Sequence, residues 1–312
     1  MAPSSLGEVK AYAPATVSNL GPGFDVLGLA LRAPGDTVTA RMSPNPGVTI
    51  RRIEGDGGKL PTDARKNTAG IAAAAVLRCA GVDVGVELDL AKGMPIGSGL
   101  GSSAASAVAA AFAVNLLVGS PLRKHQLIEP CLEAEASVAG RHADNVAPCL
   151  LGGMVLVRSV DPLDVVRLPV PEGLMIVVCS PAFELETRGA RAALPEQVPL
   201  RSLVHNSANL AGLVSALYTG DIDLLGRCIV DDVVTPVRAK LIPGGSEVME
   251  AARGAGALAS SISGAGPSIF ALCHSTPAAQ RVGEAMKRAF ARAGLDATTH
   301  VSPLDCPGVR RP

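Results

Sequence analysis

Glycine and serine alternate over residues 97–103, directly before a run of alanines. Glycine adopts positive φ values and has no Cβ, so this backbone can approach a ligand closely. Ser102 and Ser103 stand where a helix N-cap is expected, and the alanine-rich residues 104–112 favour a helix. Backbone N–H groups and the positive end of the helix dipole would then converge on one point. This pattern predicts the binding of phosphate.

The loop differs from two familiar phosphate-binding motifs. A Walker A loop places Lys and then Ser or Thr after its last glycine, whereas Gly101 is followed by Ser102 and Lys92 precedes the loop. A dinucleotide fingerprint needs the spacing GxGxxG, which the chain lacks here. The glycines alone would fit a simple turn into a core helix. The longer unit around them is therefore more informative.

The unit Pro-x-x-x-Gly-Leu-Gly-Ser-Ser-Ala, which begins at Pro95, resembles the phosphate loop of the GHMP kinases. The resemblance implies that the loop binds ATP and that Asn67, which by itself reads as a helix N-cap, lies near the nucleotide. The residues implied for the nucleotide are Asn67, Pro95, Ile96, Gly97, Ser98, Gly99, Leu100, Gly101, Ser102, Ser103 and Ala104.

A turn near the N-terminus carries a second pattern. Gly-Pro-Gly at residues 21–23 forces the chain to turn, and Asn19 and Asp25 flank it. Either residue alone is an ordinary turn former. The stretch Pro-Ala-Thr-x-x-Asn-Leu-Gly-Pro-Gly-Phe-Asp is similar to the first signature of one GHMP branch, the homoserine kinase family. That resemblance implies that Asn19 and Asp25 face an amino-acid substrate, L-homoserine.

Three functional types of side chain gather in the middle of the chain. Glu135, His142 and Asn145 each have an ordinary interpretation, because helix glutamates are commonly solvated and a single histidine is more often structural. Together they resemble the segment Glu…His-Ala-Asp-Asn-Val-Ala-Pro of the same family. The resemblance implies that Glu135 and Ser102 hold Mg²⁺ and that His142 and Asn145 face the substrate. Glu133 competes with Glu135, because sequence cannot fix a helix register to two residues.

The C-terminal half supplies further polar residues. Thr187 and Arg191 fall on the family pattern Thr-x-x-x-Arg-x-x-Leu-Pro, and Arg238 lies shortly before Leu-Ile-Pro-Gly. A guanidinium can bind a carboxylate through two hydrogen bonds, which suits a substrate with charged ends. The loop around Gly264 resembles the third GHMP signature and is implied to contact the substrate. The chain departs from the family at Thr235, where an acidic residue is more common.

Phosphoryl transfer requires that the γ-phosphoryl group be held in line with a hydroxyl and its charge neutralised. We expect Arg191 and Arg238 to bind the carboxylate of the amino acid and Asp25 to bind its ammonium group. Many GHMP kinases have an aspartate base at the position of Asn145, and an amide cannot accept a proton in that way. We therefore expect no dedicated base, and we do not expect the neighbouring Asp144 to replace it, since adjacent residues point differently.

The resemblance covers residues 9 to about 305 and implies that ATP phosphorylates L-homoserine to O-phospho-L-homoserine on the route to threonine. It gives catalytic roles to Glu135, Asn145 and Arg191. A GHMP kinase acting on mevalonate or on a diphosphocytidyl-erythritol is one alternative, and a site for both ends of a zwitterion argues against it. A non-catalytic GHMP-like sensor is a second alternative. The intact glycine loops and the implied metal-binding pair, Ser102 and Glu135, argue against it.

The bulk composition narrows the class of protein. The 312 residues include 28 Lys and Arg and 28 Asp and Glu, which gives no electrostatic case for nucleic acid or a membrane surface. Aromatic residues make up 2 % of the chain, too few for base stacking on single strands. Seven scattered cysteines suit a reducing compartment, and no apolar run reaches the length of a membrane span. We expect a cytoplasmic protein, or a plastid one after removal of a transit peptide.

The expected elements fit a two-domain α+β protein. Alternating strands over 37–53 and 84–90 precede the loop, and a helix over 122–140 follows its alanine-rich helix. Turn residues indicate a domain change, so we predict domains of residues 1–160 and 161–312. The GHMP resemblance implies an N-terminal half like ribosomal protein S5 domain 2, a ferredoxin-like C-terminal half, and a homodimer. We expect the last few residues to be loosely held.

Overall fold

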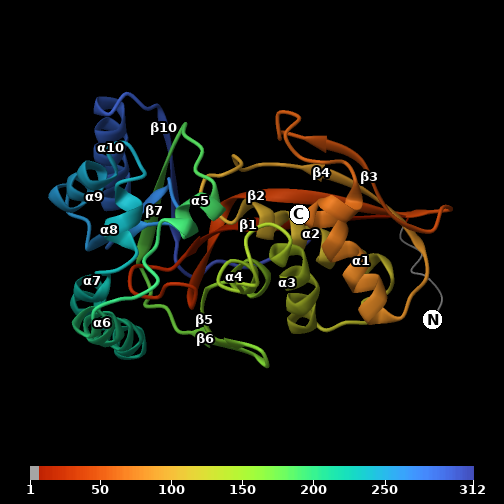
Figure 1. The fold of residues 1–312 in the computed structure, drawn as a ribbon, viewed down its shortest axis with the longest axis horizontal. Coiled ribbons are helices and arrows are strands. Elements are labelled where there is room, and N and C mark those ends of the chain that lie inside the picture. The colour runs from red at the N-terminus through yellow and green to blue at the C-terminus, as the bar shows by residue number, and fades with distance from the viewer. Residues whose placement is uncertain (1–6) are drawn as a thin grey trace.

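The computed structural model describes residues 7–312, which form two sheets with helices packed on them (Figure 1). The first sheet has the order β3-β4-β2-β5-β6, with β1 also paired to β2. Its β3–β4 pair is parallel and its other pairs are antiparallel. The strands are β1 (Glu8–Ser18), β2 (Leu27–Ser43), β3 (Gly47–Glu54), β4 (Gly85–Ala91), β5 (Met154–Val160) and β6 (Leu163–Leu168).

Helix α2 is the central element of the N-terminal half and packs against β1 and β2. It is buried around most of its circumference, and its alanines allow neighbouring elements to approach closely. The helices of this half are α1 (Thr68–Ala80), α2 (Ser102–Leu117), α3 (Ile128–Ala136) and α4 (Val146–Leu151), with short 3₁₀ helices η1 (Ala64–Lys66) and η2 (Lys124–Leu127).

The second sheet is antiparallel, with the order β10-β7-β9-β8, and α9 and α10 pack on it. The apolar strand β7 is buried along most of its length, as a central strand should be. The elements are β7 (Met175–Pro181), α5 (Thr187–Ala192), α6 (Leu200–Thr219), α7 (Ile222–Cys228), α8 (Thr235–Ala239), α9 (Gly245–Gly254), β8 (Ala259–Ile262), β9 (Ile269–Cys273), α10 (Thr276–Arg292) and β10 (Ala297–Pro303).

Two expectations about local structure are wrong. The helix expected over 122–140 is shorter: η2 precedes α3, which ends at Ala136, and Gly140 has a φ of +105°, outside helical geometry. The C-terminal tail is not loose, because Arg310 exchanges two backbone hydrogen bonds with Tyr12 of β1, at 2.8 and 3.0 Å. The tail therefore returns from the second sheet to the first.

The division into domains after residue 160 remains a prediction. Strand β6 still pairs with β5, so the first sheet extends to Leu168. Strand β7 of the second sheet begins at Met175. Within residues 7–312, none of the helices is both long and apolar enough to cross a membrane.

Candidate active site

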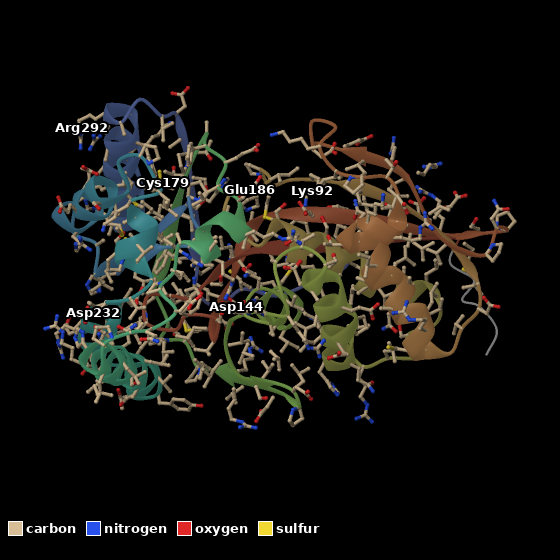
Figure 2. All side chains as sticks on the ribbon, in the orientation of Figure 1. Lys92, Asp144, Cys179, Glu186, Asp232 and Arg292 are labelled. Atoms are coloured by element: carbon tan, nitrogen blue, oxygen red, sulfur yellow. The ribbon has the colours of Figure 1, made fainter. Side chains whose placement is uncertain are left out.

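A cavity of about 500 Å³ lies where the two halves of the chain meet. Figure 2 labels three of its lining residues, Lys92, Asp144 and Glu186, near the middle of the molecule. The predicted site residues that line the cavity are Asn19, Asp25, Asn67, Ile96, Gly97, Ser98, Gly99, Gly101, Ser102, Ser103, Glu135, His142, Asn145, Thr187, Arg191, Arg238 and Gly264. The other predicted loop residues do not line it: Leu100 and Ala104 are buried in the core, and Pro95 is exposed.

The loop between β4 and α2 has the backbone that the glycines predict. Gly97, Gly99 and Gly101 all have positive φ, at 66°, 75° and 67°. The expectation that serine caps the helix is wrong, because the left-handed Gly101 occupies the N-cap position and Ser102 begins α2. None of the described side chains caps this helix, so the N–H groups of its first turn stay open to an anion.

We expect Gly101→Ala to weaken ATP binding by about 100-fold. A Cβ at this position would lie 2.2 Å from Oγ1 of Thr16 and 2.9 Å from Oδ1 of Asn145, so the loop would have to shift. Gly119→Ala is the matched control, since Gly119 also has a positive φ but no described atom lies within 4 Å of its added Cβ. Calorimetric titration with ATP measures both variants, and equal affinities would contradict the prediction.

Glu135 and Glu133 have different surroundings although both lie on α3. Glu133 is half exposed and pairs with Arg78 at 2.6 and 2.7 Å. Glu135 is 6 % exposed and lines the cavity, and its Oε2 accepts a hydrogen bond of 3.1 Å from Ser103. Burial raises the pKa of Glu135 to about 7. In the described part of the chain, nothing donates a hydrogen bond to its buried Oε1, which is therefore open to a cation.

A group of charged residues from both halves also lines the cavity. Arg191 of α5 donates to both carboxylate oxygens of Asp25, at 3.0 and 2.8 Å. His142 Nδ1 lies 3.5 Å from Asp25, and burial lowers the pKa of His142, which favours the neutral ring. Arg238 of α8 donates to the carbonyl oxygen of Gly264 at 2.7 Å. The sequence analysis predicted that these residues share one site, but it did not predict the ion pair between Asp25 and Arg191.

Asn145 and Asn19 are held by hydrogen bonds. Thr16 donates to Oδ1 of Asn145 at 2.7 Å, and the amide nitrogen of Asn145 donates to Ser18 at 3.2 Å. Asn19 donates to the carbonyl of Gly264 at 2.9 Å. Strand β1 therefore orients the side chain of Asn145, and the turn after it contacts the backbone of the Gly264 loop.

Sequence reasoning gave no role in the site to two charged residues that line the cavity, Asp144 and Lys92. Asp144 is 3 % exposed, and burial together with the nearby Asp25 raises its pKa to about 6. Lys92 is almost fully buried and forms an ion pair with Asp36. Its ammonium also donates to the carbonyl of Ser102 at 2.9 Å and to Ser106 at 2.7 Å. The available sign of a buried lysine was the position of Lys92 directly after strand β4.

Two family models match the chain. The GHMP kinases N terminal domain matches residues 67–153, and the GHMP kinases C terminal matches residues 213–292. Among curated proteins, the chain is 48 % identical to the homoserine kinase of Arabidopsis thaliana over 97 % of this chain and 84 % of that protein. It is 44 % identical to the homoserine kinase of Chlorobium phaeovibrioides over 97 % of this chain and 98 % of that protein.

Solved structures show the same likeness. The crystal structure of homoserine kinase from Cytophaga hutchinsonii superposes with a TM-score of 0.96 at 48 % identity, over 99 % of both chains. Mevalonate kinase of L. major superposes with a TM-score of 0.75 at 16 % identity, over 98 % of this chain and 99 % of that one, which is a likeness of fold alone. The expected two-domain GHMP kinase fold is confirmed.

Proposed function

The chain belongs to the homoserine kinase family of the GHMP kinases and is an ATP-dependent kinase, and we propose that it transfers the γ-phosphoryl group of ATP to the hydroxyl of L-homoserine. One observation carries the choice of substrate. A single cavity joins a phosphate-binding loop to a group of charged residues that includes Arg191, Arg238, Asp25 and Asp144. That charge set suits a small zwitterion next to ATP better than a sugar or a dianion.

We propose that Glu135 and Ser102 hold Mg²⁺. The open, buried Oε1 of Glu135 supports this, because an oxygen without a hydrogen-bond donor is a suitable ligand for a hard cation. Mg²⁺ neutralises charge on the phosphate oxygens when it is bound. The amides at the start of α2 bind the same phosphates, and Glu133 is paired elsewhere with Arg78.

At the substrate end, we propose that Arg191 and Arg238 bind the carboxylate, while Asp25 binds the ammonium group. Arg191 can keep its pairing with Asp25 during binding, because its Nη atoms face Asp25 and its Nε is a separate donor. His142, Asn19, Thr187 and Gly264 would complete the pocket around the amino acid. Burial lowers the pKa of His142 and so disfavours a further positive charge in this set.

We expect no residue to act as a general base. Asn145 stands at the position of the aspartate of other GHMP kinases, and Thr16 and Ser18 hold its amide. The proton of the hydroxyl would then pass to the transferred phosphate or to solvent late in the step. Asp144 is buried beside Asp25 and is better placed to balance the substrate's charge.

Asn145→Asp tests the absence of a base. We expect kcat to fall about tenfold, since an aspartate loses the bond to Ser18 and adds a negative charge beside the phosphates. The measurement is kcat as a function of pH. A variant whose rate increased in proportion to hydroxide would argue for a latent base position and against this mechanism.

ADP release in the presence of Mg-ATP tests the function. Turnover with L-homoserine, and not with mevalonate, serine or galactose, is the expected result. Turnover with mevalonate alone would favour the other small-alcohol kinases. ATP binding without any turnover would indicate a sensor.

We further propose a homodimer in the cytoplasm or, after processing, in a plastid. Leu200, Leu203 and Val204 are exposed on α6, which supports a contact surface there. Light scattering of the purified chain would give the mass of the assembly.

A further inference from the structure

Phe24 lies against the two arginines assigned to the substrate carboxylate. The guanidinium carbons of Arg191 and Arg238 each lie 5.2 Å from the centroid of the Phe24 ring. A cation within about 6 Å of a ring centroid is attracted to the ring. Among the described residues that line the cavity are both arginines but not Phe24. The ring therefore supports the arginines without itself facing the ligand.

The two guanidinium groups need this support because like charges repel. Burial and the nearby Arg191 lower the pKa of Arg238. The chain offsets the charge of Arg191 with the carboxylate of Asp25 and that of Arg238 with the carbonyl oxygen of Gly264. The ring of Phe24 attracts both groups at once, so it also limits how far apart they can move.

Each arginine keeps one donor for a ligand. The Nε atoms of Arg191 and Arg238 are both buried, and no described residue accepts a hydrogen bond from either. Buried donors without an acceptor are costly, so their presence in a cavity points to an acceptor that arrives with the ligand. Arg238 is itself only 3 % exposed. Two such donors in one cavity form a site for a carboxylate.

We propose that Phe24 is a positioning residue whose ring sets the spacing of Arg191 and Arg238, so that both Nε–H groups reach one substrate carboxylate. The inference rests on the proposed function, because its ligand is the carboxylate of L-homoserine. Phe24 acts through the arginines, which are assigned to the amino acid and not to ATP. Loss of the ring should therefore weaken the binding of L-homoserine and leave the binding of ATP unchanged.

Steady-state kinetics of Phe24→Leu tests the proposal. We expect KM for L-homoserine to rise about tenfold, the size of a pair of cation–π contacts, and KM for ATP to change by less than about twofold. Phe24→Tyr keeps the ring and should restore KM for L-homoserine. Phe112→Leu is the matched control, because Phe112 is also half-buried, and its cation, Lys124 at 5.9 Å, lies outside the lining of the cavity.

Two results would overturn the proposal. One is an unchanged KM for L-homoserine in Phe24→Leu; the other is an equal rise in both KM values, which would indicate general loss of structure. Should Phe24→Leu not fold, Phe24→Met fills more of the ring's volume without its π face and is judged by the same criterion. A wild-type enzyme that does not phosphorylate L-homoserine would overturn the proposed function instead, so the two failures are distinguishable.

Discussion

Glu135→Gln should lower kcat at least about 1,000-fold, because it replaces the anionic ligand proposed for Mg²⁺ with a neutral amide. ADP release in coupled assays with L-homoserine over a range of Mg²⁺ concentrations measures the effect. Glu133→Gln is the matched control, two residues earlier on α3, exposed and paired with Arg78. A similar loss in both variants would contradict the assignment of Glu135.

The same substitution should stabilise the metal-free protein at alkaline pH. Burial raises the pKa of Glu135 from 4.5 to about 7, so the folded state holds this proton more tightly than the unfolded state. The stability that the protonated carboxyl contributes is complete below pH 4.5 and is lost as the pH rises through about 7. At pH 8 Glu135→Gln should therefore raise the free energy of unfolding by about 3 kcal/mol, an advantage that disappears near pH 4.5.

Mg²⁺ binding should show the matching pH dependence. A cation that binds the carboxylate competes with its proton, so the apparent affinity of the wild-type protein for Mg²⁺ should fall below about pH 7. Thermal denaturation with and without Mg²⁺ measures this in the wild-type protein and in Glu135→Gln. A metal-induced rise in Tm that persisted in the variant would place the ion elsewhere.

Arg238→Met should raise KM for L-homoserine about 100-fold or more, since it removes a buried, charge-assisted donor. Methionine fills much of the same volume without a charge, so the fold should tolerate it. KM for ATP should change far less, because the role proposed for Arg238 is with the carboxylate of the amino acid, whereas the loop amides bind the phosphates. Arg253→Met, at an exposed position at the end of α9, is the control. Equal changes in both KM values would contradict a role confined to the carboxylate.

Local features of the site could be predicted from sequence because short segments determine them. The conformation of the loop depends on the positive φ values of Gly97, Gly99 and Gly101, and these can be expected because the residues are glycines. The serine caps were mispredicted, because the helix begins one residue earlier than expected: Gly101 occupies the N-cap position and Ser102 is the first helical residue. Type and spacing thus identified the loop but not its hydrogen bonds.

Long-range features could not be predicted in the same way. The choice between Glu133 and Glu135 depends on Arg78 of another helix, which pairs with the first and leaves the second facing the cavity. The burial of Lys92 depends on Asp36, 56 residues away. Periodicity describes one element at a time, whereas these contacts arise only when elements pack together.

The return of the C-terminal tail to β1 has a consequence for synthesis. Arg310 pairs with Tyr12, and the amide of Val309 donates to the carbonyl of Cys149 at 2.8 Å, so residues at both ends of the chain complete the first sheet. A ribosome makes β1 long before it makes Val309 and Arg310. The N-terminal half therefore leaves the ribosome with open backbone groups on β1, and these groups cannot be paired until Val309 and Arg310 have been made.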